Sequence, residues 1–319
     1  MSRPKITLFA LVAMLAVFIG AAPVLADDYP SKPITLIIPL GAGGSHDLNA
    51  RVFTSVIPTY LGQAMVVKLM PGAGGQIGTA AAIKAKPDGY TLIFTHNYID
   101  QLQPLIEKLP YDPLKDLKPV CRVNYAPSSV TIRSDKPWKN LDELLAYGKE
   151  QKGKMIFVTS GNWGAVMVPG ARILLKAGVE ATYVPYKGGG PAIQALLAGD
   201  GDFTMMFPSV LMPLVEANKV RILASAGDKR IWPDVPLLSE LGYKVGTMDR
   251  IVLAPKGVPE DRMQILRDAF KKIQEDKTYK NLMKKIGENT AFMDGPEYEK
   301  VRIEQHEEYQ KLVKKLTGG

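Results

Sequence analysis

The sequence has few of the residues that disulfide frameworks and metal centres require. Its 319 residues include one cysteine, Cys121, and three histidines that lie far apart, His46, His96 and His306. A single cysteine excludes an intrachain disulfide and any site built from several thiolates. A zinc centre is usually built from several His or Cys ligands, and three histidines far apart in sequence argue against one. We therefore expect no bound metal ion.

Nucleotide-binding motifs are also absent. Glycine pairs at 41–43 and 72–74 resemble the start of the dinucleotide fingerprint, but His46 and Ile77 stand where its third glycine is needed. No GxxxxGK[ST] segment, which would grip a phosphate chain, occurs in the sequence. We expect no cofactor of any kind.

The excess of positive charge is small and spread out. Lys and Arg total 40 against 32 Asp and Glu, a net charge of +8. Basic and acidic residues alternate through 297–315, so no patch of one sign is indicated, and we expect no nucleic-acid partner. The hydrophobic share of 46% and the charged share of 23% are those of an ordinary globular protein.

Residues 1–26 have the three parts of a secretory signal peptide. Two basic residues precede an apolar run at 6–22, and residues 24–26 (VLA) form a small-x-small cleavage site. The alternative is an uncleaved anchor, but the run is short for a bilayer span and Pro23 interrupts it. We expect cleavage after Ala26 and a periplasmic protein.

Beyond the leader, short apolar strands alternate with helices. The expected strands are residues 34–39, 65–68, 90–95, 155–159, 181–185, 203–207, 221–226 and 251–254. The expected helices are residues 48–60, 76–85, 141–151, 165–177 and 192–198. This alternation predicts an α/β fold with mainly parallel sheets. Residues 259–277, 279–287 and 295–316 predict a helical C-terminal segment without strands.

Two extended connections divide the chain. Residues 120–132 contain Pro127 and precede a new helix start, and a second extended stretch covers residues 245–254. We predict a first lobe of residues 27–124 and 248–319 and a second lobe of residues 125–247. Ligands usually bind in the cleft between two such lobes.

In the first lobe, two strands run into glycine-rich turns before helices, at residues 41–47 (GAGGSHD) and 71–75 (PGAGG). Such a turn points backbone N–H groups and the positive end of a helix dipole at one place, where an anion can bind. The simpler alternative is that the glycines only let the chain turn. The first loop is the stronger candidate because it also holds Ser45, His46 and Asp47, and we expect Asp47 to be an N-cap.

The second lobe supplies two similar loops, residues 160–164 (SGNWG) and 186–191 (YKGGGP). Their side chains can donate hydrogen bonds, and Trp163 and Tyr186 can flank an apolar ligand body, although Trp163 could equally be a core aromatic. Donors on both sides of a cleft suit a molecule with carboxylate groups. The sequence offers little that resembles a catalytic motif. Residues 45–47 are a serine, a histidine and an aspartate, but consecutive residues cannot form the hydrogen-bonded chain of a hydrolytic triad.

The order of these short motifs resembles a known family. From Tyr29 to about Leu316 the chain is similar to the extracytoplasmic solute-binding proteins of the tripartite tricarboxylate transporters, the Bug or TctC-like family. The motifs that carry the resemblance are residues 29–34 (YPSKPI), 43–51 (GGSHDLNAR), 71–75 (PGAGG), 87–92 (PDGYTL), 109–113 (LPYDP), 160–162 (SGN), 184–188 (VPYKG) and 237–242 (LLSELG).

The resemblance implies a two-lobe periplasmic-binding-protein fold, type II-like or Venus flytrap, with a C-terminal helical segment. It implies a monomer that captures a small carboxylate, a di- or tricarboxylate or an aromatic acid, and delivers it to membrane permease subunits without catalysis. An exported hydrolase-like enzyme and a protein that presents its ligand to a sensor remain alternatives. The candidate ligand-binding residues are Gly43, Gly44, Ser45, His46, Asp47, Ser160, Asn162, Trp163, Lys187, Gly188 and Gly189.

The sequence departs from the family pattern at four places. Residues 68–70 (KLM) replace the usual Val-Glu-Asn-Arg, and Asp249 stands where tryptophan is usual. His46 replaces a small residue and Met167 replaces a common histidine. These changes leave the fold intact but leave the identity of the ligand open.

Overall fold

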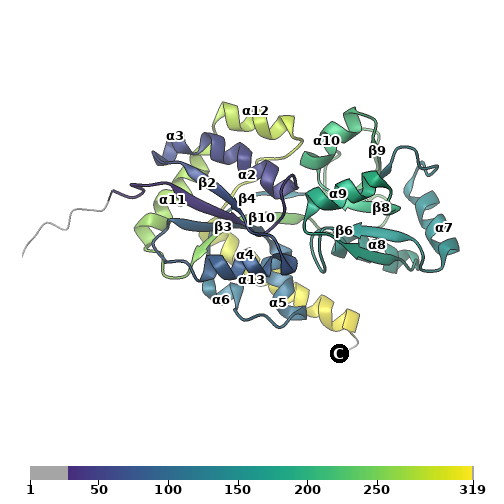
Figure 1. Ribbon diagram of the computed structural model, residues 1–319, viewed down its shortest axis with the longest axis horizontal. Helices are drawn as coiled ribbons and strands as arrows, with labels where there is room; N and C mark the ends of the chain where they lie inside the picture. The colour runs from purple at the N-terminus through teal and green to yellow at the C-terminus, as the bar shows by residue number, and fades with distance from the viewer. Residues whose placement is uncertain (1–27, 318–319) are drawn as a thin grey trace, which may run out of the picture.

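The protein consists of two lobes, each built on its own β-sheet (Figure 1). The structure, a computed structural model, describes residues 28–317, so the predicted signal peptide at 1–26 lies outside the described residues. Helices flank the sheet in each lobe, and extended segments join the two. The predicted α/β fold with two lobes is confirmed.

The first sheet has the spatial strand order β11-β4-β10-β3-β1-β2. Its strands are β1 Ile34–Ile38, β2 Met65–Leu69, β3 Thr91–His96, β4 Leu117–Ala126, β10 Met248–Pro255 and β11 Met293–Asp294. Strand β1 is parallel to its neighbours β2 and β3. Strand β10 is buried along its whole length, as expected for a central strand covered on both faces.

The second sheet has the order β7-β6-β8-β5-β9. Its strands are β5 Ser129–Arg133, β6 Ile156–Thr159, β7 Thr182–Pro185, β8 Phe203–Met206 and β9 Val220–Ser225. Strand β6 is parallel to both β7 and β8. All eight strands expected from the sequence are confirmed, with small shifts at their ends.

The expectation of mainly parallel sheets is wrong for the strands that join the lobes. Strand β4 leads out of the first sheet directly into β5, and the chain returns from β9 to β10. Because β10 enters its sheet from the second lobe, it runs antiparallel to β3 and β4. Strand β5 enters from the first lobe and runs antiparallel to β8 and β9. Both sheets are therefore mixed.

Helices cover both sheets. The α-helices are α2 Ser45–Val56, α3 Pro58–Leu61, α4 Gln76–Ile83, α5 Gln103–Ile106, α6 Pro113–Asp116, α7 Leu141–Gln151, α8 Met167–Ala177, α9 Gly189–Ala198, α10 Pro208–Glu216, α11 Glu260–Ile273, α12 Lys277–Lys285 and α13 Gly295–Thr317. A 3₁₀ turn, η2 Ala73–Gly75, precedes α4, and a π-helix, η3 Tyr98–Leu102, follows β3. The pattern of apolar residues in the sequence did not predict α10, which contains Pro213 in its interior.

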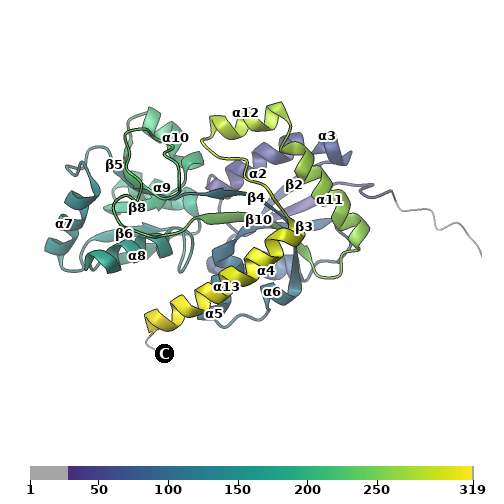
Figure 2. The ribbon, with the colours of Figure 1, turned by 180° about the vertical axis from the view of Figure 1, so that it is seen from behind.

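The C-terminal segment is helical as predicted, but the expectation that it has no strand is wrong. The two-residue strand β11 pairs with β4 before α13 begins. Helix α13 then packs against β4 and η3, and Figure 2 shows it crossing the back of the molecule. The last helix therefore supports the segment that follows β3.

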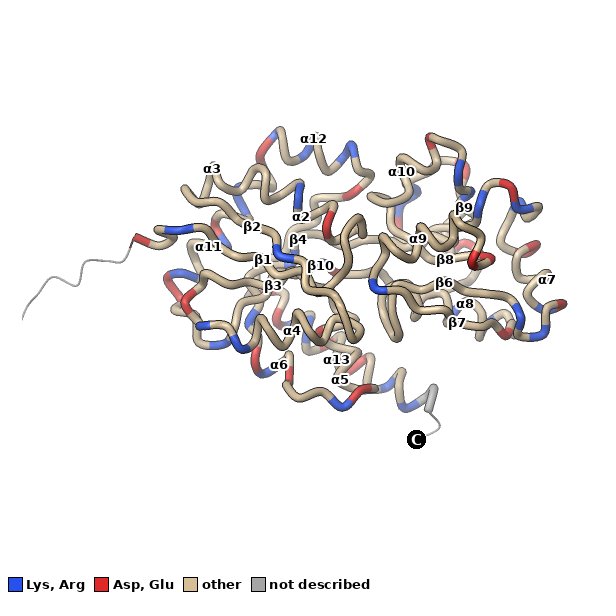
Figure 3. The backbone as a smooth tube through the Cα atoms, viewed as in Figure 1, with Lys and Arg blue, Asp and Glu red and all other residues tan. Residues whose placement is uncertain are grey.

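The cores of the two lobes are continuous at the connection. Alternate residues of β1 face different apolar clusters, with Leu36 on the side of α2 and α11 and Ile37 on the side of α4 and α13. The cluster that fills the second lobe also includes Tyr98 of η3 and Met248 of β10. Charged residues of both signs are scattered over both lobes (Figure 3).

Candidate ligand-binding site

Four loops meet between the two lobes. Two of them follow β1 and β2 of the first sheet and precede α2 and η2, and the other two follow β6 and β7 of the second sheet and precede α8 and α9. Because β1 is parallel to β2 and β6 is parallel to β7, each pair of loops leaves its sheet at the same edge. Residues of all four loops line one shared cavity.

The loops after β1 and β7 touch through their backbones. A Cβ atom on Gly188 would lie 2.8 Å from the amide nitrogen of Gly41, and one on Gly41 would lie 2.5 Å from the carbonyl oxygen of Lys187. Gly188 also has φ 110°, a conformation that favours glycine. The glycines here are therefore needed for the close approach of the lobes.

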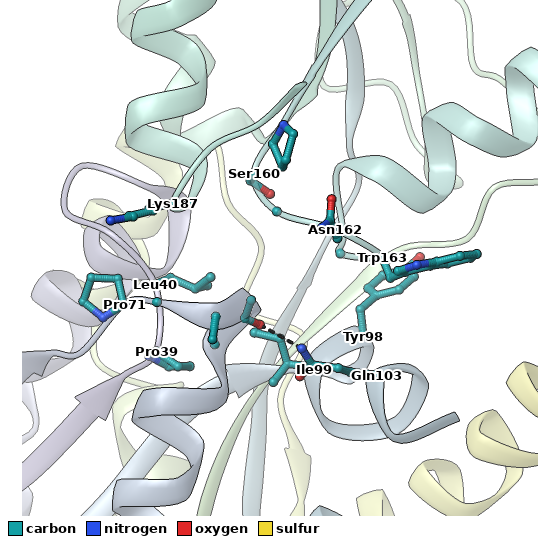
Figure 4. Close-up of a pocket in the computed structure, with 18 of the residues that line it drawn as sticks. Pro39, Leu40, Pro71, Tyr98, Ile99, Gln103, Ser160, Asn162, Trp163 and Lys187 are labelled. Carbon is teal, nitrogen blue, oxygen red and sulfur yellow. Dashed lines mark hydrogen bonds between the residues drawn. The ribbon is translucent and has the colours of Figure 1, made fainter. Parts of the chain in front are cut away.

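The larger cavity has a volume of about 190 Å³. Its walls are Pro39, Leu40, residues 71–75, His96, Tyr98, Ile99, Gln103, residues 160–164 and residues 185–188. Figure 4 shows Trp163 at one end and Lys187 at the other, with Ser160 and Asn162 across from Ile99 and Gln103. Apolar and aromatic walls with a few polar groups are typical of a site for a small organic molecule.

A smaller cavity of about 20 Å³ adjoins it. Its walls are Leu40, Gly44, Ser45, His46, His96, Ser160, Ala165, Gly189, Phe207 and Met248. Helices α2 and α9 begin at this cavity, at Ser45 and Gly189, so the positive ends of two helix dipoles face it. Leu40, His96 and Ser160 line both cavities and mark their junction.

Nine of the eleven sequence-predicted site residues line these cavities. Ser160, Asn162, Trp163, Lys187 and Gly188 line the larger one, and Gly44, Ser45, His46, Gly189 and again Ser160 line the smaller one. Gly43 and Asp47 line neither. Gly43 is exposed at the tip of its loop.

The expectation that Asp47 is the N-cap of α2 is wrong. Helix α2 begins at Ser45 and its N-cap is Gly44, which places Asp47 in the first turn. From there the Asp47 Oδ2 atom accepts the backbone N–H of Gly43 at 2.9 Å, and Oδ1 pairs with Arg51 Nε at 2.9 Å. Asp47 therefore holds the shape of the loop and does not face the cavities.

Trp163 has an unusual backbone. Its φ of 53° is in the left-handed region, which costs a non-glycine residue about 1 to 2 kcal/mol. The Trp163 N–H donates to the sulfur of Met167 at 3.0 Å, so the methionine that replaces the common histidine stabilises this turn. Strain of this kind concentrates at ligand-binding positions.

Sequence reasoning missed four lining residues at the end of β3 and just after it. His96 is the last residue of that strand, Tyr98 and Ile99 belong to η3, and Gln103 begins α5. The Gln103 Nε2 atom donates to the carbonyl of Gly74 at 3.3 Å and so ties α5 to the loop after β2. No glycine turn marks this segment, but its place at the carboxyl edge of a parallel strand would have identified it.

The site is free of negative side chains and its histidines are neutral. No Asp or Glu is among the described residues that line the two cavities. Burial, together with nearby His96 and Arg250, holds the pKa of His46 well below its usual value. Burial and then Arg250 lower the pKa of His96 to about 3. The positive character of the site therefore comes from helix ends and Lys187.

Two further observations concern the described residues. Within residues 28–317, no group of three His, Cys, Asp or Glu side chains is arranged to hold a metal ion. Over the same residues, no helix combines the length and apolar character that crossing a membrane requires.

Comparison with known proteins places this architecture in a family. Residues 49–317 match the family described as "Tripartite tricarboxylate transporter family receptor". Protein BugT of Bordetella pertussis is 35% identical over 258 residues, which cover 77% of this chain and 79% of BugT. The structure of periplasmic binding protein BugD superimposes with a TM-score of 0.84 at 29% identity, covering 90% and 98% of the two chains. MatC from Rhodopseudomonas palustris, solved with bound malate, gives a TM-score of 0.82 at 25% identity, covering 89% and 100%. The chain therefore belongs to the tripartite tricarboxylate transporter receptor family.

Proposed function

We propose that the protein binds a small carboxylate in the cleft between its lobes and delivers it to the membrane permease subunits of a tripartite transporter. One observation carries this proposal: the N-termini of α2 and α9 face the same small cavity, and no acidic side chain lines it. Two converging positive dipole ends favour an anion. The bound malate in the related protein MatC supports a carboxylate as that anion.

Each part of the proposed site has its own task. The free amides at the start of α2 and α9, with the Ser45 hydroxyl, bind the carboxylate in the smaller cavity. The body of the ligand then extends into the larger cavity, against Trp163 and Asn162. Lys187 lies at the exposed end, where it attracts the anion on approach.

The proposed lobes are residues 27–124 with 248–319, and residues 125–247. A ligand that touches both lobes binds the closed form better than the open form and shifts the population towards it. The backbone contact between Gly41 and Gly188 is the closed contact that such a shift favours. The protein works in this proposal as a periplasmic monomer.

The arrangement does not support the hydrolase alternative. The His46 Nε2 atom lies 3.1 Å from the Thr95 carbonyl, and Asp47 binds Gly43 and Arg51. His46 and Asp47 are therefore occupied with different partners, and a base held by a carboxylate is not assembled from them. We propose reversible binding without turnover.

A thermal-shift screen tests the proposed function. Ligand-stripped protein is heated with malate, adipate, citrate and benzoate, each beside its neutral amide. A ligand that binds only the folded protein raises the melting temperature. We expect at least one acid to raise it and the matching amide to leave it unchanged. Equal shifts with acid and amide, or no shift with any acid, would reject carboxylate binding.

A further inference from the structure

His96 occupies the point where the two cavities meet. It is the last residue of β3, it lines both cavities, and only 4% of its surface is exposed. Ser160, from the other lobe, is the polar residue that shares this position. A ligand group at the junction would therefore have one polar side chain from each lobe beside it.

The hydrogen bonds of His96 determine which ring nitrogen carries the proton. The backbone N–H of Ile99 donates to His96 Nδ1 at 3.4 Å, so Nδ1 is an acceptor. In a neutral imidazole the other nitrogen, Nε2, then carries the hydrogen. No residue in the described part of the chain accepts a hydrogen bond from Nε2. Because His96 lines both cavities, this N–H can donate to an oxygen atom of a ligand bound there.

The neighbouring histidine cannot play the same role. His46 lines the smaller cavity, with its ring centroid 5.2 Å from that of His96, but its Nε2 atom lies 3.1 Å from the carbonyl oxygen of Thr95. The single N–H of a neutral His46 is used in that bond. His96 is therefore the histidine at the site with an N–H to offer.

The groups around His96 keep its ring uncharged. His46 faces it from α2, Tyr98 lies with its ring centroid 6.1 Å away in η3, and Arg250 approaches from β10. Arg250 forms a bidentate ion pair with Glu288, with both contacts at 2.8 Å. Burial and Arg250 hold the pKa of His96 at about 3, so its N–H acts as a neutral donor at physiological pH.

We propose that His96 is a specificity-determining residue of this receptor, whose Nε2–H donates to a carboxylate oxygen of the ligand at the junction of the two cavities. This inference rests on the proposed function. Ser160 binds the same carboxylate from the second lobe, so the contact forms fully only when the lobes close. The site thus selects acids whose carboxylate reaches the junction while the body occupies the larger cavity.

Calorimetric titration with malate, adipate and benzoate tests the role of His96. His96→Phe keeps a planar ring but removes the N–H, and losing a hydrogen bond to a charged group weakens binding by about tenfold to a hundredfold. His96→Gln restores an N–H near the position of Nε2 and should recover most of the affinity. His306→Gln, in α13 and outside both cavities, is the matched control and should bind like the wild type.

A second measurement does not depend on the variants folding. Nitrogen NMR of histidine-labelled wild-type protein reports which ring nitrogen carries hydrogen. We expect a protonated Nε2 in His96 and a shift of its signal when the acid binds. Wild-type affinity in a folded His96→Phe, or an Nε2 signal unchanged at saturation, would overturn the inference. If the wild type binds none of the three acids, the proposed function fails as well.

Discussion

The backbones of Gly188 and Gly41 meet across the cleft so closely that a Cβ atom on Gly188 would lie 2.8 Å from the amide nitrogen of Gly41. Two loops from different lobes thus form one wall around the helix N-termini that face the smaller cavity. Any side chain added at this contact must separate the lobes or distort a loop. The contact therefore connects ligand binding with closure.

Gly190→Ala should hinder closure without unfolding either lobe. Gly190 lies in the first turn of α9, where alanine is tolerated, but its Cβ would overlap the carbonyl oxygen of Ala42 in the other lobe. We expect weaker binding and a more extended shape in the presence of acid. Small-angle scattering at saturating malate or adipate measures the shape. A profile as compact as that of the wild type would contradict the steric account, and circular dichroism confirms that the variant is folded.

Ser160→Ala should weaken binding clearly. The residue lines both cavities, and a hydrogen bond to a charged carboxylate contributes about 1.5 to 3 kcal/mol, so the affinity should fall roughly tenfold to a hundredfold. The double variant with Ser45→Ala should lose affinity from both lobes. Calorimetry measures both effects. Unchanged affinity in the double variant would show that the carboxylate does not bind at the junction of the two cavities.

The two neutral histidines should make the folded state sensitive to acid. An unfolded histidine has a pKa near 6.5, whereas burial lowers that of His96 to about 3 and that of His46 well below its usual value. Below about pH 6.5 the unfolded chain binds protons that the folded protein does not, so stability is complete above this pH and is lost as the pH falls.

We expect each histidine to lower the free energy of unfolding by about 1.4 kcal/mol per pH unit between roughly pH 6 and pH 4. Urea unfolding across this range measures the slope. His96→Gln removes one of the two groups and should make the pH dependence shallower. The same slope in variant and wild type would show that His96 is protonated in the folded protein.

A buried ion pair connects the first lobe to the start of α10. Arg250 and Glu288 are almost completely buried, and Glu288 Oε1 also accepts the backbone N–H of Ser209 at 3.3 Å. Glu288→Leu leaves Arg250 buried without its partner and should cost about 3 to 5 kcal/mol of stability.

Adding Arg250→Met to Glu288→Leu should recover part of that loss, because an apolar pair can replace a buried ion pair at little cost. Chemical unfolding of both variants provides the comparison. If Glu288→Leu alone were as stable as the wild type, the Arg250–Glu288 pair would not stabilise the fold as described.

The predicted leader has a direct chemical test. Cleavage after Ala26 gives a mature N-terminus at Asp27. We expect mass spectrometry of the periplasmic fraction to find a peptide that begins with Asp27. A full-length chain in the membrane fraction would mean that residues 6–22 serve as an anchor.

Sequence reasoning predicted the parts of the site that glycine turns mark. Residues 41–47 and 160–164 lie between the lobes because a strand, a glycine turn and a helix follow one another there. His96 escaped prediction because no glycine turn follows β3. The charged group that lowers its pKa, Arg250, is also far away in sequence. The contact between Gly41 and Gly188 depends on how two lobes pack, which no local pattern encodes.

The sequence pattern did not predict the antiparallel strands or α10, and each omission has its own cause. Strand alternation indicates sheets but not strand direction, and the direction of β10 follows from its return out of the second lobe. Pro208 and Pro213 obscure the helical pattern of α10, although Pro208 stands at the first helical position, where proline is favoured.

Calorimetric titration of an acid against its own amide tests the central claim most directly. Ligand-stripped wild-type protein is titrated with each acid that raises its melting temperature and, separately, with the amide of the same carbon skeleton. The two ligands share shape and apolar surface but differ in charge, and the site offers helix N-termini and no acidic wall. We predict saturable one-to-one binding of the acid, recovery of the acid chemically unchanged, and little or no binding of the amide. Equal binding of both, or conversion of the acid to a product, would contradict the account.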